Sequence, residues 1–232
     1  MLVNVGKLMS HTSTKGGGGF NPSLVDAWFM SGLSNSDKPG SITGVMGNEM
    51  ALKNFDFTSE SGFGEGTYEG ALVFDGVDDY GICTGLPILD DYTLICRREI
   101  ISIKNSSAVA SKRTYPDDVG NFGAFIFERV FTSGGKSIYS FGSPNGISEF
   151  DSNEVVYQTK TSYNGTTITS GSSNDSDTLC LGANAYNISL GRCQEFSNVA
   201  IYYFALYNKS LTIEEIETEK ERLNEEWLKR KN

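Results

Sequence analysis

The sequence predicts an all-β protein, an antiparallel sandwich or barrel that is followed by one helix. From residue 21 to about residue 208, short runs rich in β-branched and aromatic residues alternate with turn residues. No helical pattern comes between these runs, which indicates antiparallel pairing. The chain contains 26 glycines against 5 prolines, as expected for many tight turns. Residues 211–232 then change to a helical period.

The strand-like runs begin after an arm, residues 1–20, that ends in Gly16 to Gly19 and has the composition of a flexible segment. The first run, GALVFDGVDDYGIC, looks like two strands joined by a tight hairpin turn at Asp75 and Gly76, because glycine tolerates positive φ. The later runs are YTLICRREIISI, FGAFIFERVF, KSIYSFG, EVVYQTKTSY, TITSG, TLCLGA and NVAIYYFALY. The chain therefore divides into the arm, a β domain over 21–210 and a helix over 211–232.

The final segment predicts an amphipathic helix. Thr212 and Glu215 have the spacing of a capping box, which places the helix start at Thr212. The apolar stripe consists of Ile213, Ile216, Leu223 and Trp227, with Lys220 filling one step. Two interpretations stay open for the distal half: Leu223, Trp227 and Leu228 dock a partner, or they extend the contact with the sandwich.

Composition restricts the classes of partner. The net charge of −10 and the pI near 4.6 argue against nucleic acid, and Lys112, Arg113 and the tail LKRK are the only local basic groups. No apolar run has the length of a signal peptide or a membrane span, so we expect synthesis in a cytoplasm without export and no membrane contact.

The cysteines predict neither a zinc site nor disulfides. Cys83, Cys96, Cys180 and Cys193 form no C-x-x-C pair, and the one histidine, His11, lies in the arm. In a protein made under reducing conditions, we expect all four to be free thiols. Calcium is the one cofactor that the sequence leaves open.

Three stretches resemble the laminin-G-like, or concanavalin A-like, jelly-roll family. They are GALVFDGVDDYGIC; TSYNGTTI, in which Tyr163, Asn164 and Gly165 resemble a later hairpin of the family; and LCLGAN followed by NVAIYYFALYNKSLTIEEI. The resemblance implies a two-sheet antiparallel jelly-roll sandwich with a closing helix. The strand YTLICRRE lacks a tryptophan that the family often has.

The arm, the stretch NPSLVDAWFMSGLSNSDKPG and the long helix resemble versions carried by gut Bacteroidales and their phages. This narrower resemblance implies a non-catalytic structural or adhesive module of a phage virion, on the tail or capsid surface. The partners would be other virion proteins, held through the arm and helix in an oligomer or assembly. The alternatives are a free lectin-like module that binds a cell-surface glycan and, third, a laminarinase-type glucanase.

The stretch FDGVDDY raises the question of calcium. Turn geometry explains Asp75 and Gly76, and the carboxylates of Asp78 and Asp79 can accept backbone hydrogen bonds there. Calcium binding by Asp75, Asp78 and Asp79 is the alternative, but calcium needs six to eight oxygen ligands and one short turn supplies only some of them.

A second acid cluster, EFDSNE, has the Glu-x-Asp-x-x-Glu spacing of laminarinase-type glucanases. Those enzymes place apolar residues between their acids, where this chain has Ser152 and Asn153. We therefore interpret Glu149, Asp151 and Glu154 as part of a polar loop that leads into EVVYQTK, and we predict no catalytic residues and no enzymatic activity.

Glycan binding has its own candidates. Sugar sites combine aromatic faces with a few polar groups, and two turn-rich loops, 112–121 and 172–187, contain both. The candidate ligand-binding residues are Tyr115, Asp117, Asp118, Asn184 and Tyr186.

Overall fold

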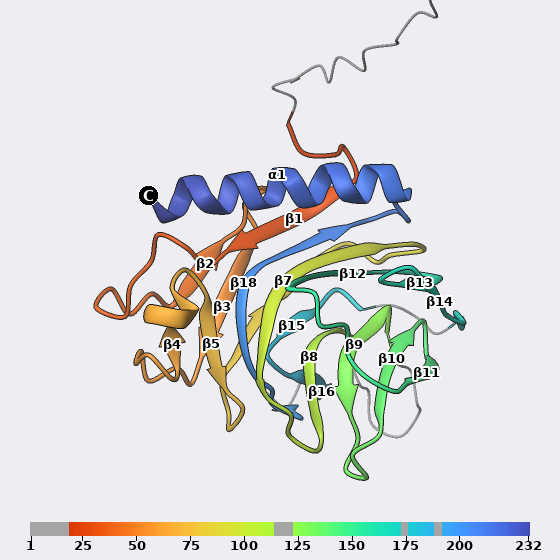
Figure 1. Cartoon of the computed structure of the whole chain (residues 1–232), viewed down its shortest axis with the longest axis horizontal. Coiled ribbons are helices and arrows are strands. Elements are labelled where there is room, and N and C mark those ends of the chain that lie inside the picture. Colours follow the sequence, from red (N-terminus) through yellow and green to blue (C-terminus); the bar gives the residue numbers. More distant parts are fainter. Residues whose placement is uncertain (1–18, 114–122, 173–175, 188–191) are drawn as a thin grey trace, which may run out of the picture.

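A computed structural model of the chain shows two antiparallel sheets that lie face to face, with a helix across the outer face of one of them (Figure 1). This confirms the predicted two-sheet sandwich with a C-terminal helix. The structure describes residues 19–113, 123–172, 176–187 and 192–232. The predicted arm therefore lies almost entirely outside the described residues.

We call the sheet beneath the helix sheet A. In spatial order it contains β14 (Thr166–Thr167), β13 (Ser162–Tyr163), β12 (Val155–Thr159), β7 (Thr93–Ser102), β18 (Asn198–Tyr207), β5 (Leu72–Asp75) and β4 (Gly62–Phe63), and β1 (Leu24–Phe29) pairs with β18. A one-turn 3-10 helix, η1 (Gly66–Tyr68), follows β4.

Sheet B is the second layer. In spatial order it contains β11 (Ser143–Ile147), β10 (Lys136–Ser140), β9 (Phe125–Val130), β8 (Ser107–Lys112), β15 (Leu179–Leu181), β6 (Tyr80–Cys83), β3 (Glu49–Lys53) and β2 (Ser41–Thr43). A separate two-stranded ribbon consists of β16 (Asn184–Asn187) and β17 (Arg192–Gln194).

The strand β18 organises sheet A. One of its edges pairs with β7 over almost its whole length. Its other edge is shared, because its first half pairs with β5 and its second half pairs with β1. Each of its residues from Val199 to Tyr207 is buried, as expected for a central strand that is covered on both faces.

The predicted hairpin at Asp75 and Gly76 is wrong. The strands on either side of this turn belong to different sheets, since β5 pairs with β18 and β4 in sheet A, whereas β6 pairs with β15 and β3 in sheet B. The turn therefore carries the chain from one sheet to the other. Gly76 has φ of +71°, and an added Cβ would lie 2.9 Å from the backbone nitrogen of Asn198.

The second hairpin follows the prediction. Asn164 and Gly165 connect β13 to β14, and both have positive φ (42° and 87°). Two adjacent residues with positive φ match the twist of a two-residue hairpin, and Asn-Gly is the preferred pair for it. The stretch Tyr163-Asn164-Gly165 therefore forms the turn that its sequence indicates.

The main core lies between the two sheets. It is built from inward-facing aliphatic and aromatic side chains, among them Trp28, Phe74, Phe125, Phe127 and Phe204. A second apolar cluster lies on the outer face of sheet A and is closed by the helix α1 (Ile213–Lys231). The helix is therefore one layer of a three-layer arrangement rather than an appendage (Figure 1).

The helix begins where the capping box predicts. The Thr212 hydroxyl accepts from the backbone N–H of Glu215, and the Glu215 carboxylate accepts from the backbone N–H of Thr212. The buried stripe differs from the predicted one, since Ile213 is 59% exposed and Glu219 takes the step assigned to Lys220. The buried Glu219 carboxylate accepts hydrogen bonds from the Tyr207 hydroxyl and the Asn21 backbone, and it pairs with Arg222. In the described part of the chain, no helix has the length and apolar character needed to cross a membrane.

Candidate functional site

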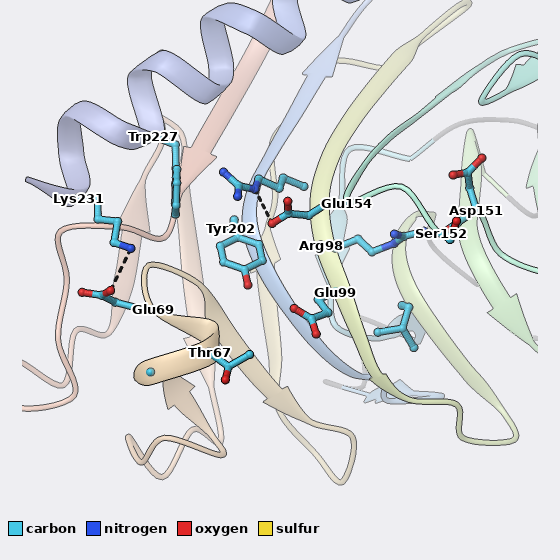
Figure 2. Close-up of a pocket in the computed structure, with 13 residues that line it drawn as sticks. Thr67, Glu69, Arg98, Glu99, Asp151, Ser152, Glu154, Tyr202, Trp227 and Lys231 are labelled. Carbon is cyan, nitrogen blue, oxygen red and sulfur yellow. Dashed lines mark hydrogen bonds and ion pairs between the residues drawn. The ribbon is translucent and has the colours of Figure 1, made fainter.

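A groove of about 640 Å³ opens beside the C-terminal half of α1, on the outer face of sheet A. Its walls come from η1, β7, β18, the loop before β12 and the end of α1 (Figure 2). The polar groups that line it are Thr67, Glu69, Arg97, Arg98, Glu99, Asp151, Ser152, Glu154, Tyr202 and Lys231. Hydroxyls, carboxylates and cations from five segments therefore meet at one surface depression, which we call the groove.

The base of the groove is an aromatic pair covered by a guanidinium group. Tyr202 and Trp227 meet edge to face, with ring centroids 5.7 Å apart. The Arg97 guanidinium lies 4.2 Å from the Trp227 ring centroid and 4.9 Å from that of Tyr202, within the range of cation–π attraction. The guanidinium group also donates two hydrogen bonds: Nε donates to the Glu154 carboxylate at 2.8 Å, and Nη1 donates to the Asn224 side-chain oxygen at 2.8 Å. Arg97 is thereby held in one position.

The charges of the groove are unevenly paired. Glu69 pairs with Lys231 at 2.9 Å, and Arg97 pairs with Glu154. Glu99 is exposed, and no described residue forms a hydrogen bond or ion pair with its carboxylate. Figure 2 shows Glu99, Thr67 and Tyr202 around the open part of the groove. The free carboxylate is therefore available to a ligand.

Tyr202 remains a neutral hydroxyl in this setting. Burial raises its pKa to about 12, and the negative charges of Glu99 and Glu154 contribute to the shift. A neutral phenol can both donate and accept a hydrogen bond, whereas a carboxylate only accepts. The open part of the groove therefore offers both kinds of hydrogen-bonding group.

Behind the groove, a buried ion pair joins the two sheets. Arg98 of β7 and Glu128 of β9 form two parallel hydrogen bonds, at 2.9 Å (Nε to Oε2) and 2.5 Å (Nη2 to Oε1), and their side chains are 3% and 0% exposed. Arg98 also donates to the backbone carbonyls of Asp151 and Asn153. The Tyr163 hydroxyl donates to Glu128 at 2.7 Å. This network fixes the loop that forms one wall of the groove.

The pKa shifts follow from this burial. Desolvation lowers the pKa of the Arg98 guanidinium, but the adjacent Glu128 carboxylate more than offsets it, so the pKa lies above its usual value. Burial and the Glu128 charge both raise the pKa of Tyr163. Arg98 therefore stays charged, and Tyr163 stays protonated as a donor.

A β-bulge points Glu128 inward. Against β10, Arg129 pairs with Ser137 and Ile126 with Tyr139, so three steps on β9 oppose two on β10. Glu128 lies in this irregularity with φ of +48°, which is uncommon for a residue other than glycine. A bulge changes the direction of a side chain relative to strict alternation. The carboxylate consequently reaches Arg98 between the sheets.

The EFDSNE acids lie on the loop before β12, as predicted, and each has a structural partner. Glu149 pairs with Lys136 and Glu154 with Arg97. Asp151 accepts from the backbone of Asn153 and the side chain of Asn164, and these bonds lower its pKa although burial acts to raise it. Asp151 and Glu154 line the groove, but the three acids do not alternate along a strand.

Asp75, Asp78 and Asp79 are the described residues that come together as a metal could require, with ligand atoms within 4.8 Å of one another. Asp75 accepts from the backbone of Val77, and the buried Asp79 accepts from Ser61 and from the backbone of Asp75. Lys104 donates to the carbonyls of Asp75 and Gly76, at 3.0 and 3.1 Å. The Lys104 ammonium group already lies at the turn, and calcium binding stays an untested alternative.

We expect Asp79 to make stability fall as pH rises. Burial raises the Asp79 pKa to about 7, against the lowering effect of its two hydrogen bonds. Between about pH 4 and pH 7 the folded protein holds a proton that the unfolded chain has lost, so the free energy of unfolding decreases by up to about 4 kcal/mol over that range. Chemical denaturation across this range should show the slope, and Asp79→Asn should reduce it. Asp56→Asn, at an exposed position, is the control, and an unchanged slope in Asp79→Asn would contradict the assignment.

Of the five residues predicted to bind a glycan, the structure describes the side chain of Asn184 alone. Tyr115, Asp117 and Asp118 lie outside the described residues, and of Tyr186 only the backbone, in β16, is described. Asn184 is 1% exposed, and its amide bonds both Glu195 and Arg113. Its burial does not support contact with a ligand.

The three residues predicted to dock a partner differ in their exposure to solvent. Leu223 is fully buried and Trp227 is 5% exposed, and both pack on sheet A. The Trp227 indole donates to the Gly70 carbonyl at 2.9 Å. The structure therefore supports the second interpretation for these two, namely contact with the sandwich, while Leu228 is 44% exposed. The predicted basic group of Lys112 and Arg113 is likewise buried.

Sequence reasoning did not identify the groove, although one signal pointed to it. In the apolar run YTLICRREIISI, three consecutive charged residues, Arg97 to Glu99, interrupt the strand pattern. Charged groups in the middle of a buried strand need partners or a function. Here Arg97 and Glu99 line the groove, and Arg98 forms the ion pair behind it.

Together, the fold and the groove define a two-sheet β-sandwich protein with a polar surface depression. No family model matches the chain, and no curated protein matches it. Several solved structures do match the chain in their fold. The binding domain of botulinum neurotoxin serotype D has a TM-score of 0.52 at 11% identity, covering 86% of this chain and 51% of that one.

A second group of structural neighbours consists of sialidases. A mutant Trypanosoma rangeli sialidase that displays trans-sialidase activity has a TM-score of 0.51 at 13% identity, over 84% of this chain and 32% of that one. The same sialidase in complex with a difluorinated nononic acid derivative has a TM-score of 0.51 at 12% identity, over 90% and 34%. This chain spans about a third of the length of the sialidases and about half of the neurotoxin domain. At such identities the likeness shows the fold.

The prediction that the chain is not an enzyme is contradicted by these neighbours. It depended on Ser152 and Asn153, which stand where laminarinase-type glucanases have apolar residues between their acids. Sialidases, which are enzymes, contain this fold over most of the present chain. The exclusion of enzymatic activity is therefore withdrawn.

Proposed function

We propose that this chain is a carbohydrate-binding module and that the groove receives the sugar. The observation that carries the proposal is the free Glu99 carboxylate, which faces the Tyr202 hydroxyl and Thr67 across an open depression. Sugar hydroxyls donate and accept hydrogen bonds, so they suit a surface that offers both kinds of group. The groove volume of about 640 Å³ lies within the range of small-molecule sites.

The charge of the groove favours a neutral sugar over an acidic one. The cations Arg97 and Lys231 are already paired with Glu154 and Glu69. Glu99 remains as a free negative charge, on a chain with a formal net charge of −10. An anionic sugar would meet repulsion from Glu99 and find no unpaired cation in the groove, whereas a neutral sugar can donate its hydroxyls to that carboxylate.

The structural neighbours support a binding role at the level of the fold. The botulinum neurotoxin structures are described as binding domains, and they share this sandwich over most of the present chain. Because one fold can host many functions, the proposal depends on the groove and takes only its general plausibility from the neighbours.

Replacing Glu99 should weaken sugar binding by about tenfold or more. A hydrogen bond to a charged group contributes roughly 1.5–3 kcal/mol, and Glu99→Gln removes the charge but keeps the shape. Glu221→Gln is the matched control, because it removes the same charge from an exposed helix position outside the groove. A glycan array with paired neutral and sialylated glycans should select the ligand, and calorimetry with that ligand should then compare the three proteins.

The outcomes separate the parts of the proposal. Binding of neutral glycans that Glu99→Gln weakens and Glu221→Gln preserves supports both the site and the ligand class. Selective binding of sialylated glycans contradicts the ligand class. Binding that Glu99→Gln leaves unchanged contradicts the groove as the site, and no binding to any glycan contradicts the function.

At a finer level, we propose that the module belongs to a phage virion and serves adhesion there. The support is the resemblance of the arm, the stretch from residue 21 to residue 40 and the long helix to versions carried by gut Bacteroidales and their phages. With Leu223 and Trp227 buried, attachment to an assembly would depend on the arm and on exposed helix residues such as Leu228. Proteomics of purified particles tests this placement, and absence of the chain from them would contradict it.

A further inference from the structure

Two of the four cysteines approach each other on the outer face of sheet B. Cys180 lies on β15 and Cys193 on β17, and their sulfur atoms are 3.3 Å apart. Cys180 is fully buried, whereas Cys193 is half-buried. The sulfurs are already in contact across two different strands, so only a small local movement separates them from bonding distance.

The two remaining cysteines lie elsewhere and serve as a comparison. Cys83 and Cys96 face the main core between the sheets, and they are 1% and 0% exposed. Burial raises the pKa of Cys83 to about 11 and that of Cys96 further. Inert, buried thiols of this kind are structural. The chain thus contains one adjacent cysteine pair and two cysteines without such a neighbour among the described residues.

The surroundings of the pair suit a covalent link between two layers. The ribbon of β16 and β17 is held near sheet B by contacts that include the Ser111 hydroxyl, which accepts from the backbone of Ala185. Ala185 pairs with Cys193 within the ribbon, and Cys180 pairs with Ser111 within sheet B. A bond between the two sulfurs would therefore join the ribbon to the sheet at a place where they already pack.

We propose that Cys180 and Cys193 form a disulfide when the folded protein meets a disulfide oxidant such as glutathione disulfide. The half-buried Cys193 reacts first: its thiol loses a proton to water, and the resulting thiolate attacks one sulfur of the oxidant and releases one glutathione thiolate, which takes up a proton. Cys180 then attacks the Cys193 sulfur of this mixed disulfide, and its proton leaves with the second glutathione. In total, two protein thiols are oxidised and one glutathione disulfide is reduced to two glutathione molecules.

This inference refines the prediction that all four cysteines are free thiols. Under reducing conditions the prediction stands as made. In an oxidising medium the structure assigns the first disulfide to Cys180 and Cys193, which is one of the several pairs that four cysteines could form. The link would close a short loop, since the two residues are 13 positions apart, and would restrict the unfolded chain.

The test is oxidation of the native full-length chain with glutathione disulfide, followed by acid quenching, alkylation in denaturant and peptide mass spectrometry. We expect one cross-linked pair, Cys180 with Cys193, together with complete alkylation of Cys83 and Cys96. Thermal unfolding of the oxidised protein should occur roughly 5 °C higher than that of the reduced protein. Cys83→Ser should still form the link, and Cys193→Ser should not.

Other products would overturn the proposal. These are a stable glutathione adduct on Cys193 with Cys180 still alkylated, a cross-link that involves Cys83 or Cys96, or four alkylated cysteines after prolonged oxidation. The wild-type peptide map decides the question even if a cysteine variant folds poorly. None of these results depends on sugar binding, so the test is independent of the proposed function.

Discussion

Replacing Glu128 with glutamine is expected to lower the free energy of unfolding by about 3–5 kcal/mol, because it leaves the buried Arg98 guanidinium without a counter-charge. Both side chains are almost fully excluded from water, and their two hydrogen bonds join sheet A to sheet B. The loss should appear as an earlier midpoint in urea or guanidinium unfolding, with the slope of the transition unchanged.

Glu154→Gln is the matched control for this variant. It also removes the carboxylate partner of an arginine, but the Glu154 side chain is 47% exposed, so water can replace it. An exposed pair contributes at most about 1 kcal/mol. If Glu128→Gln were no more destabilising than Glu154→Gln, the buried pair would not connect the sheets as described. The double variant Arg98→Met with Glu128→Leu should be more stable than Glu128→Gln, because it leaves no buried charge.

Trp227→Ala should destabilise the protein by a similar amount, about 3–5 kcal/mol, because it opens a large cavity between α1 and sheet A. The indole is 5% exposed, packs edge to face on Tyr202, donates to the Gly70 carbonyl and lies under the Arg97 guanidinium. Thermal or chemical unfolding measures the change, and Trp227→Phe should recover part of it by refilling the cavity.

Leu228→Ala is the control for the helix, since Leu228 follows Trp227 directly but is itself 44% exposed, and its truncation should change stability by at most about 0.5 kcal/mol. Deletion of residues 221–232 should destabilise the sandwich rather than leave it unaffected, because it removes the buried Leu223 and Trp227. Cooperative melting of Trp227→Ala near the wild-type temperature would contradict this assignment and restore the interpretation of Trp227 as an anchor for a partner.

Local chemistry made parts of the fold predictable. The capping box at Thr212 and the Asn164–Gly165 turn each depend on a few neighbouring residues, and the structure has both as predicted. The strand runs follow from β-branched and aromatic composition in the same way. Such features need no knowledge of distant contacts, which is why the sequence was sufficient for them.

Features that depend on distant pairing were not predictable in this way. The turn at Asp75 and Gly76 has hairpin chemistry, but the choice between one sheet and two is made by β18 and β15, more than a hundred residues later. Glu128 would face outward by strict alternation, and the bulge that turns it inward is visible only in the register with β10. The groove was missed because its residues come from five separate segments.

The position of β18 in sheet A has a consequence for how the chain acquires its structure during synthesis. Residues 198–207 emerge from the ribosome late, yet both β5 and β7 depend on them for a hydrogen-bonded neighbour. Until then these earlier strands have unpaired, apolar edges, which invite association with other chains. Sheet A can therefore be completed only after β18 has been translated.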